Sequence, residues 1–254
     1  MKEQWRLLQT GFNTAFSNMA VDRAILVENS EGKVPPTVRF YGWIPPAISI
    51  GYFQSVAEEI DVNACGKLGV DYVRRMTGGG AVFHDKELTY SIVIPEAHPA
   101  IPKNILKSYG RICNALLQGL AQLGINGTYA PINDILVDGK KISGNAQTRK
   151  ANTILQHGTI LLDVDVDTMF SLLKVPNEKI KDKLIQDVKQ RVTSIQQILG
   201  KKIRFEEVAE ALKLGFEEEF DVELIQGILT KEEKTLATQF EKECFSTTHW
   251  NHRR

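Results

Sequence analysis

The sequence predicts an α+β fold in which helices pack on a mixed or antiparallel β-sheet. Strand-like runs rich in β-branched and aromatic residues recur through the first two thirds of the 254 residues, and the pattern becomes helical from about residue 165. Two of the runs are joined by the tight-turn pair Asp138 and Gly139 rather than by a crossover helix. Strands followed by helices are typical of the α+β class, and we expect one domain over residues 1–254.

The residue pattern in the first half of the chain predicts several strands, one long helix and one short helix. Asn13 and Thr14 can cap a helix whose apolar residues recur on one face, and two adjacent prolines at 45–46 mark a turn between strands. The run 88–94 is apolar on both faces, so we expect it at the centre of the sheet. The predicted strands are 5–9, 38–41, 47–52, 72–73, 81–83 and 88–94, and the short helix is 57–68.

The second half begins with the most regular helical pattern, 103–123, which Gly124 ends. Cys113 lies on the apolar stripe of this helix and is therefore expected to fill the core. Predicted strands follow at 134–137, 141–147 and 153–163. Amphipathic helices are predicted at 192–199, 205–216 and 232–245, the last opened by the capping box of Thr230 and Glu233.

Composition excludes several classes of function. Hydrophobic residues are 43% and charged residues 24% of the chain, as in an ordinary globular protein. The 31 basic and 31 acidic residues cancel, which argues against nucleic acid as an obligate partner. No apolar run is long enough to span a membrane, and the three unclustered cysteines suit free thiols. We therefore expect a cytoplasmic protein without a membrane or nucleic-acid partner.

The most unusual stretch is a glycine triplet between two predicted strands. Gly78, Gly79 and Gly80 follow the basic pair Arg74 and Arg75. Glycine leaves backbone N–H groups open to a ligand, and two guanidinium groups beside them suit a phosphate. The stretch is neither a dinucleotide-binding G-x-G-x-x-G nor a P-loop, because no helix pattern follows and no Gly-Lys-Ser/Thr is present. The alternative is a flexible hairpin with two solvated arginines.

A second polar cluster surrounds the predicted hairpin at 138–139. Lys140 and Lys141 should show opposite faces because side chains alternate along a strand, so one of them can point toward a ligand. His157 opens another strand that can face the same site. The alternatives are a solvated hairpin lysine and a histidine satisfied within the core.

Together these motifs resemble the lipoate–protein ligase and octanoyltransferase family, which is related to the biotin protein ligases. The resemblance is carried by the glycine stretch and the lysine stretch in this order, and it extends over nearly the whole chain: 39–41, 51–54, 74–84, 133–134, 141–144, 157–161 and 250–251. It implies the biotin/lipoate protein ligase-like catalytic fold. The chain departs from the longer ligases of this family, which carry a C-terminal accessory domain: we expect none here, with a separate accessory ligase subunit left open as an additional partner.

The resemblance assigns roles to individual residues. Lys141 is implied as the catalytic group between the acyl carbonyl and the α-phosphate, and Mg²⁺ would bridge phosphate oxygens with Asp134 as a candidate ligand. The implied ATP and acyl-adenylate site comprises Arg74, Arg75, Thr77, Gly78, Gly79, Gly80, Ala81, Val82, Phe83, Asn133, Asp134 and Lys141. The implied acyl site comprises His84, Ser143, Gly144, His157 and Gly158.

Two activities of this family need separating. A ligase activates lipoate with ATP, whereas one branch of transferases moves octanoyl from acyl carrier protein through a cysteine before the strand lysine. Residues 127–139 contain no cysteine and carry Asn133 and Asp134, so we expect an ATP- and Mg²⁺-dependent lipoate–protein ligase. The alternatives are an octanoyltransferase, which 42–43 and 87–91 resemble, and a non-catalytic nucleotide or acyl binder. The expected acceptors are lipoyl domains of 2-oxoacid dehydrogenase E2 subunits or the glycine cleavage H protein.

Overall fold

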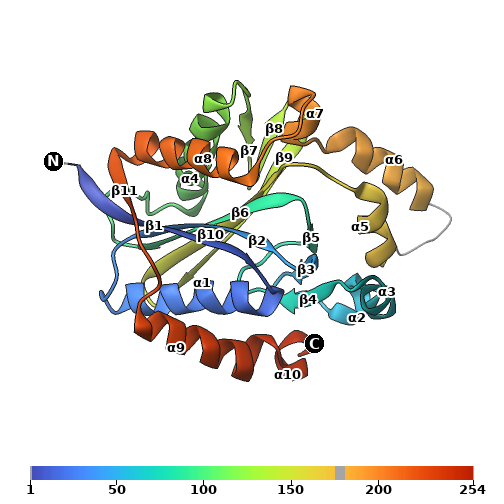
Figure 1. Cartoon of the computed structure of the whole chain (residues 1–254), viewed down its shortest axis with the longest axis horizontal. Coiled ribbons are helices and arrows are strands. Elements are labelled where there is room, and N and C mark those ends of the chain that lie inside the picture. The colour runs from blue at the N-terminus through green and yellow to red at the C-terminus, as the bar shows by residue number, and fades with distance from the viewer. Residues whose placement is uncertain (1, 175–180, 254) are drawn as a thin grey trace.

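A computed structural model describes residues 2–174 and 181–253 and confirms the α+β class. Its centre is an eight-stranded mixed sheet with helices on both faces (Figure 1). The strand order is β11 (Val222–Gln226), β1 (Glu3–Asn13), β2 (Thr37–Trp43), β6 (Glu87–Pro95), β10 (Thr153–Leu161), β9 (Lys140–Lys150), β8 (Asp134–Val137) and β7 (Thr128–Ala130).

The sheet changes from parallel to antiparallel at β2. Strand β1 runs parallel to β11 and β2, and every pair from β2 through β6, β10, β9 and β8 to β7 is antiparallel. The predicted central position of 88–94 is confirmed, because β6 lies between β2 and β10 and is buried along almost its whole length. The predicted hairpin is confirmed as well: Asp138 and Gly139 both have positive φ, 49° and 75°, as a tight hairpin turn requires.

Each face of the large sheet is covered by a helix pair, which gives three layers in Figure 1. Helix α1 (Ala15–Ser30) begins at Thr14, whose side chain accepts from Ser17 N as predicted. It packs with α9 (Lys231–Phe240) on one face, and α4 (Ile105–Gln122) packs with α8 (Phe205–Phe220) on the other. The apolar stripe of α4, with Cys113 in it, is buried as predicted.

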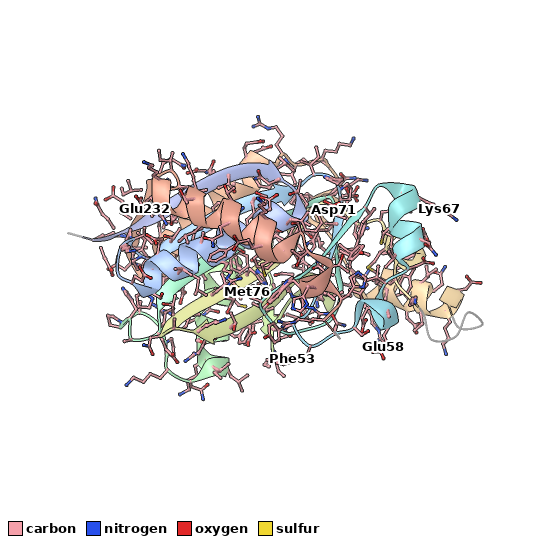
Figure 2. All side chains as sticks on the ribbon, turned by 90° about the horizontal axis from the view of Figure 1, so that it is seen from below. Phe53, Glu58, Lys67, Asp71, Met76 and Glu232 are labelled. Atoms are coloured by element: carbon pink, nitrogen blue, oxygen red, sulfur yellow. The ribbon has the colours of Figure 1, made fainter. Side chains whose placement is uncertain are left out.

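A second, three-stranded sheet carries the glycine stretch. Its order is β4 (Asp71–Arg74), β3 (Ala47–Ile50) and β5 (Val82–His84), so β4 and β5 both pair with β3 and not with each other. The alternative of a simple glycine hairpin is therefore wrong. A small apolar cluster joins this sheet to α2 (Val56–Glu59), α3 (Val62–Leu68) and α5 (Val166–Leu172). Figure 2 shows α3, with Lys67, at the opposite end of the molecule from Glu232 in the first turn of α9.

Three local predictions are wrong. The helix expected over 57–68 is broken at Ile60, which bridges to Leu173 in an extended conformation. Strand β11 interrupts the helical third and was not expected. Its parallel partner β1 lies at the other end of the chain, so no local pattern indicates the pairing. The helix expected over 232–245 ends at Phe240 and continues as a π-helical turn, Glu241–Phe245, before α10 (Thr248–Asn251). The remaining helices are α6 (Lys181–Arg191) and α7 (Ile195–Leu199).

None of the helices within the described ranges is both long enough and apolar enough to cross a bilayer.

Candidate active site

A cavity of about 650 Å³, counted with its open mouth, lies between the small sheet and the centre of the large sheet. Its wall joins the glycine stretch to β9 and β10, so the two polar clusters seen in the sequence meet in space. The residues on the wall are Met19, Tyr41, Trp43, Ser49, Arg75, Gly79, Gly80, Ala81, Val82, His84, Thr89, Asn133, Lys141, Gly144, Asn145, Ala146, His157, Gly158 and Thr159.

Lys141 brings an ammonium group to this wall. Its Nζ lies 2.7 Å from Asp134 Oδ1, and both side chains are partly exposed, 41% and 32%. The contact is ionic rather than a well-aligned hydrogen bond, because this carboxylate oxygen accepts none. Gly144 makes room for the lysine, since a Cβ there would lie 3.0 Å from Nζ. Lys140 is exposed and lies outside the cavity wall, as the alternation along β9 predicts.

Asn133 and Asn145 fix the strand beside Lys141. The Asn133 carbonyl accepts from both N and Nδ2 of Asn145, at 3.0 and 2.9 Å. Tyr90 Oη donates to Asn145 Oδ1 at 2.7 Å. Gly158 on the neighbouring strand must be glycine, because a Cβ there would lie 2.2 Å from Asn145 Oδ1. These contacts hold β9 rigidly where it presents Lys141.

Arg75 is the internal support of the glycine stretch. Its Nη2 donates to the carbonyls of Gly78 and Gly80 at 2.7 and 2.8 Å, and its Nη1 donates to Ser49 O at 2.9 Å and Ser49 Oγ at 3.1 Å. Its Nε donates to Thr77 Oγ1 at 3.1 Å. Burial lowers the pKa of Arg75 to about 10. All five N–H donors therefore have partners within the protein, and the guanidinium shapes the loop rather than offering a free fork to a phosphate.

Arg74 does not lie at the cavity, contrary to the prediction. Its side chain is fully buried and donates to the backbone carbonyls of Gly51, Gln54 and Trp250, among others. It ties the C-terminal helix α10 to β4, and Trp250 Nε1 returns a hydrogen bond to the Arg74 carbonyl at 2.8 Å. The alternative of two solvated arginines is also wrong, because Arg74 and Arg75 are 0% and 4% exposed.

Ser49, His84 and Glu87 form a hydrogen-bonded chain at the cavity, which we call the cavity triad. Ser49 Oγ lies 2.7 Å from His84 Nε2, and His84 Nδ1 lies 2.6 Å from Glu87 Oε1. The Trp43 ring stacks on the imidazole, with centroids 4.0 Å apart and an interplanar angle of 15°. Ser49 and His84 line the cavity, whereas Glu87 lies behind them and is buried.

Thr77, His157 and Asp22 form a second chain, the buried triad. Thr77 Oγ1 lies 2.7 Å from His157 Nε2, and His157 Nδ1 lies 3.4 Å from Asp22 Oδ2. Burial would raise the pKa of Asp22, but Arg39, whose Nη1 is 2.7 Å away, and His157 outweigh it and lower that pKa. Burial lowers the pKa of His157 in spite of Asp22.

The other predicted site residues divide into two groups. Gly79, Gly80, Ala81, Val82, Gly144 and Gly158 lie on the cavity wall with both histidines. Thr77, Gly78, Phe83 and Ser143 do not: Phe83 packs in the apolar cluster of the small sheet, and Ser143 is buried beside Asn145. On β5 strand alternation explains the difference, since Val82 and His84 lie on the wall and Phe83 between them faces the other side.

Sequence reasoning missed several wall residues: Met19, Tyr41, Trp43, Ser49, Thr89, Asn145 and Ala146. Most come from strands and helices that are far from both motifs along the chain. One signal was available in α1, where Asp22 is the one acid in the mostly apolar stretch 19–26. A buried carboxylate requires partners, and its position indicates a polar centre beneath the helix.

The three cysteines lie away from the cavity wall, as expected of packed thiols. Cys65 and Cys113 are buried, and burial raises their pKa values to about 11 and about 12. Cys244 lies in the π-helical turn that follows α9. Within the described residues, no group of three His, Cys, Asp or Glu side chains could hold a metal ion. Asp134, the expected Mg²⁺ ligand, is a single carboxylate whose Oδ1 lies 2.7 Å from Lys141 Nζ.

The large mixed sheet and the small sheet that carries the glycine stretch enclose a partly apolar cavity with a strand lysine on its wall. The chain belongs to the lipoyl protein ligase A/B catalytic domain family, whose model matches residues 14–217. The expected family and fold are therefore confirmed.

Relatives and solved structures resemble the chain over its full length. It is 41% identical to octanoyltransferase LipM of Geobacillus kaustophilus and 35% identical to that of Bacillus subtilis, over 100% of this chain and 99% of each relative. A bi-partite lipoate protein ligase from Thermoplasma acidophilum is 30% identical, with a TM-score of 0.90 over 98% of this chain and 96% of the other. Lipoate-protein ligase A bound with ATP is 28% identical, with a TM-score of 0.84 over 99% of both chains.

These relatives overturn the predicted activity. We expected an ATP-dependent lipoate–protein ligase because residues 127–139 lack a cysteine and contain Asn133 and Asp134. The full-length relatives at 35–41% identity are octanoyltransferases, so activation of lipoate with ATP and Mg²⁺ is not supported as the activity of this chain. Arg75 itself is not the free phosphate fork that the sequence predicted, because all of its donors have partners within the protein.

Proposed function

We propose that the protein transfers an octanoyl group from a thioester donor to a lysine of a lipoyl carrier domain. The observation that carries this proposal is the full-length similarity to octanoyltransferases LipM. The acceptor is supported by the Thermoplasma acidophilum ligase, whose structural analysis names an E2 lipoyl domain as its partner in a lipoylation system. The donor class we propose is octanoyl-acyl carrier protein, because a thioester already carries the activation that a free acid would need.

The cavity has the chemistry to hold an eight-carbon acyl chain. Met19, Trp43 and Val82 supply apolar surface on its wall, and Ala81 and Ala146 leave room beside them. Burial of the chain would contribute about 0.8 kcal/mol for each CH₂ removed from water. Such a slot fixes the position of the acyl carbonyl relative to the polar end of the cavity.

Lys141 is the proposed catalytic cation. Attack on a thioester places negative charge on the carbonyl oxygen, and a fixed ammonium stabilises that charge without rearranging. Asp134 holds the ammonium in place, and the Asn133–Asn145 contacts hold the strand. As the new bond from the attacking group to the acyl carbon is completed, the bond from sulfur breaks, and the donor leaves as a thiol with the proton that the attacking group gives up.

The proposal is tested by incubating the protein with octanoyl-acyl carrier protein and a lipoyl domain and following the intact mass of the domain. We expect the domain to gain one octanoyl group without ATP. Separate reactions with E2 lipoyl domains and with the glycine cleavage H protein identify the acceptor. Modification from free octanoate that requires ATP, with no transfer from the thioester, would contradict the proposal.

A further inference from the structure

The cavity triad has the order of groups found in serine acyl-transfer enzymes. A hydroxyl, an imidazole and a carboxylate follow one another at 2.7 and 2.6 Å, and the hydroxyl and the imidazole lie on the wall of the proposed acyl cavity. The three residues come from β3, β5 and β6, so rigid strands hold this geometry. Such a constellation is recognised by its geometry and not by sequence position.

The surrounding partners fix the direction of every hydrogen bond in the cavity triad. As a carboxylate, Glu87 accepts at Oε1, so His84 Nδ1 carries the proton, and in the neutral imidazole His84 Nε2 is then the acceptor. Arg75 Nη1 donates to Ser49 Oγ at 3.1 Å, which leaves the Ser49 hydroxyl proton free to donate to His84 Nε2. Thr89 Oγ1 donates to the same Glu87 oxygen at 2.6 Å and accepts from Trp43 Nε1 at 2.7 Å. The imidazole is therefore held in the tautomer that a general base requires.

We propose that Ser49 carries the octanoyl group as an oxyester intermediate, with His84 as general base and Glu87 as the positioning residue. Ser49 Oγ attacks the thioester carbonyl while His84 Nε2 takes the hydroxyl proton. The carbon–sulfur bond breaks, and the thiol of the donor leaves with that proton. The lysine amine of the carrier then attacks the ester and gives a proton to His84, the carbon–oxygen bond breaks, and His84 returns the proton to Ser49.

The rest of the cavity is consistent with serine in this role. No cysteine is among the wall residues of the described chain, and the Cys113 thiol is buried in α4 with a pKa raised by burial to about 12. Lys141 lies on the same wall, where its ammonium can stabilise the oxyanion in both steps. Thr77 is not an equivalent nucleophile, because it is fully buried and does not reach the wall.

The inference rests on the proposed function and is tested separately from it. The protein is mixed with octanoyl-acyl carrier protein in the absence of a lipoyl domain, quenched in acid and examined by intact mass and peptide mapping. We expect one octanoyl group on the peptide containing Ser49, stable to neutral hydroxylamine as an oxyester is. Ser49→Ala should lose the adduct and lower transfer by at least about 10²-fold.

Two further variants keep the test independent of folding. Ser49→Cys should carry the octanoyl group as a thioester, so its adduct should become sensitive to neutral hydroxylamine. Glu87→Gln should slow adduct formation about 10²-fold, and the acidic limb of its pH–rate profile should move to lower pH because the protonated imidazole loses its carboxylate. Ser108→Ala, a buried hydrogen-bonded serine on α4 outside the cavity, is the matched control and should react like the native protein.

Two results would overturn the inference while leaving the proposed function intact. One is wild-type transfer by Ser49→Ala, and the other is an octanoyl adduct mapped to any residue other than Ser49. If instead the native protein transfers no octanoyl group to a lipoyl domain, the proposed function fails and the inference fails with it.

Discussion

The cavity triad and the buried triad contain the same kinds of groups but differ in what surrounds them. Each links a hydroxyl, a histidine and a carboxylate, and Arg75 donates to both hydroxyls. In the buried triad, Asp22 also accepts from Arg39, Tyr41 and Ser91, at 2.7, 3.0 and 2.9 Å. In the cavity triad, Glu87 Oε2 accepts no hydrogen bond.

This difference shows how one arrangement of residues can be structural in one place and chemical in another. The charge of Asp22 is balanced by a buried arginine, and its triad ends at Thr77, which is sealed from the cavity. Glu87 is paired with His84 rather than with an arginine, and its triad ends at Ser49 on the wall. Charge compensation and access to the ligand, rather than residue type, separate the two roles.

The largest expected effect is loss of stability when the buried triad loses its charge. Asp22→Asn would leave the Arg39 guanidinium buried without its counterion, which should lower the free energy of unfolding by about 3–5 kcal/mol. Urea denaturation measures this. Asp167→Asn removes an exposed ion pair with Lys189 and should change the free energy of unfolding little. Equal losses of stability in the two variants would show that the buried charge of Asp22 contributes no more than an exposed one.

The next effect concerns the rate of transfer at the cavity. Lys141→Ala should lower the single-turnover rate of octanoyl transfer on the order of 10²–10³-fold, because a preorganised donor to the developing charge is lost. Lys141→Met should be equally slow, since it keeps the length of the stem but not the charge. Lys140→Ala is the control and should be nearly silent, because its side chain is exposed outside the cavity wall. Like behaviour of the two alanine variants would show that Lys141 is an ordinary surface lysine.

A smaller effect is expected in the pH dependence of stability. The pKa of His157 in the folded protein lies below its ordinary value of 6.5, chiefly through burial, and Arg75 and His84 add to this while Asp22 opposes it. At pH values between the two pKa values, His157 binds a proton in the unfolded chain but not in the folded chain. The free energy of unfolding therefore falls as the pH drops from about 6.5 toward the folded pKa.

Urea midpoints between about pH 7.5 and about pH 5 should reveal this slope. His157→Gln should flatten the profile in this range because neither state of the variant can bind the proton. His249→Gln is the control, since this histidine is exposed. A profile of unchanged slope in His157→Gln would assign the pH dependence to other groups.

The smallest effect is expected at the cysteines. Changing Cys65, Cys113 and Cys244 together to serine or alanine should lower stability on the order of 1 kcal/mol per site, through lost packing, and leave transfer largely intact. Thermal unfolding and the transfer assay measure the two quantities. A covalent octanoyl thioester on any of the three cysteines would contradict the assignment of Ser49 in the cavity triad as the residue that carries the octanoyl group.

Local signals in the sequence predicted much of the fold. The Asp138 and Gly139 turn, the Thr14 cap and the doubly apolar β6 depend on residues close together along the chain, and all three were confirmed. Strand β11 could not be predicted in this way, because its partner β1 lies more than two hundred residues earlier.

The site was predicted in outline but not in detail. Lys141 and the glycine stretch were expected together, and the structure places them on one wall. The direction of Arg74 depends on carbonyl oxygens in the C-terminal segment, which no local pattern reveals. Ser49 can be recognised as a site residue only when β3 is placed between β4 and β5, because the pairing of β3 with β5 brings His84 beside it.

The most direct test of the central claim is to locate the octanoyl chain in the protein. An octanoyl thioester with a photoreactive diazirine at the far end of the chain is bound, illuminated and mapped by peptide mass spectrometry. The account predicts labelling of the apolar wall, at Met19, Tyr41 or Val82. Labelling confined to another depression, such as the one lined by Gln4 and Glu223, would contradict it.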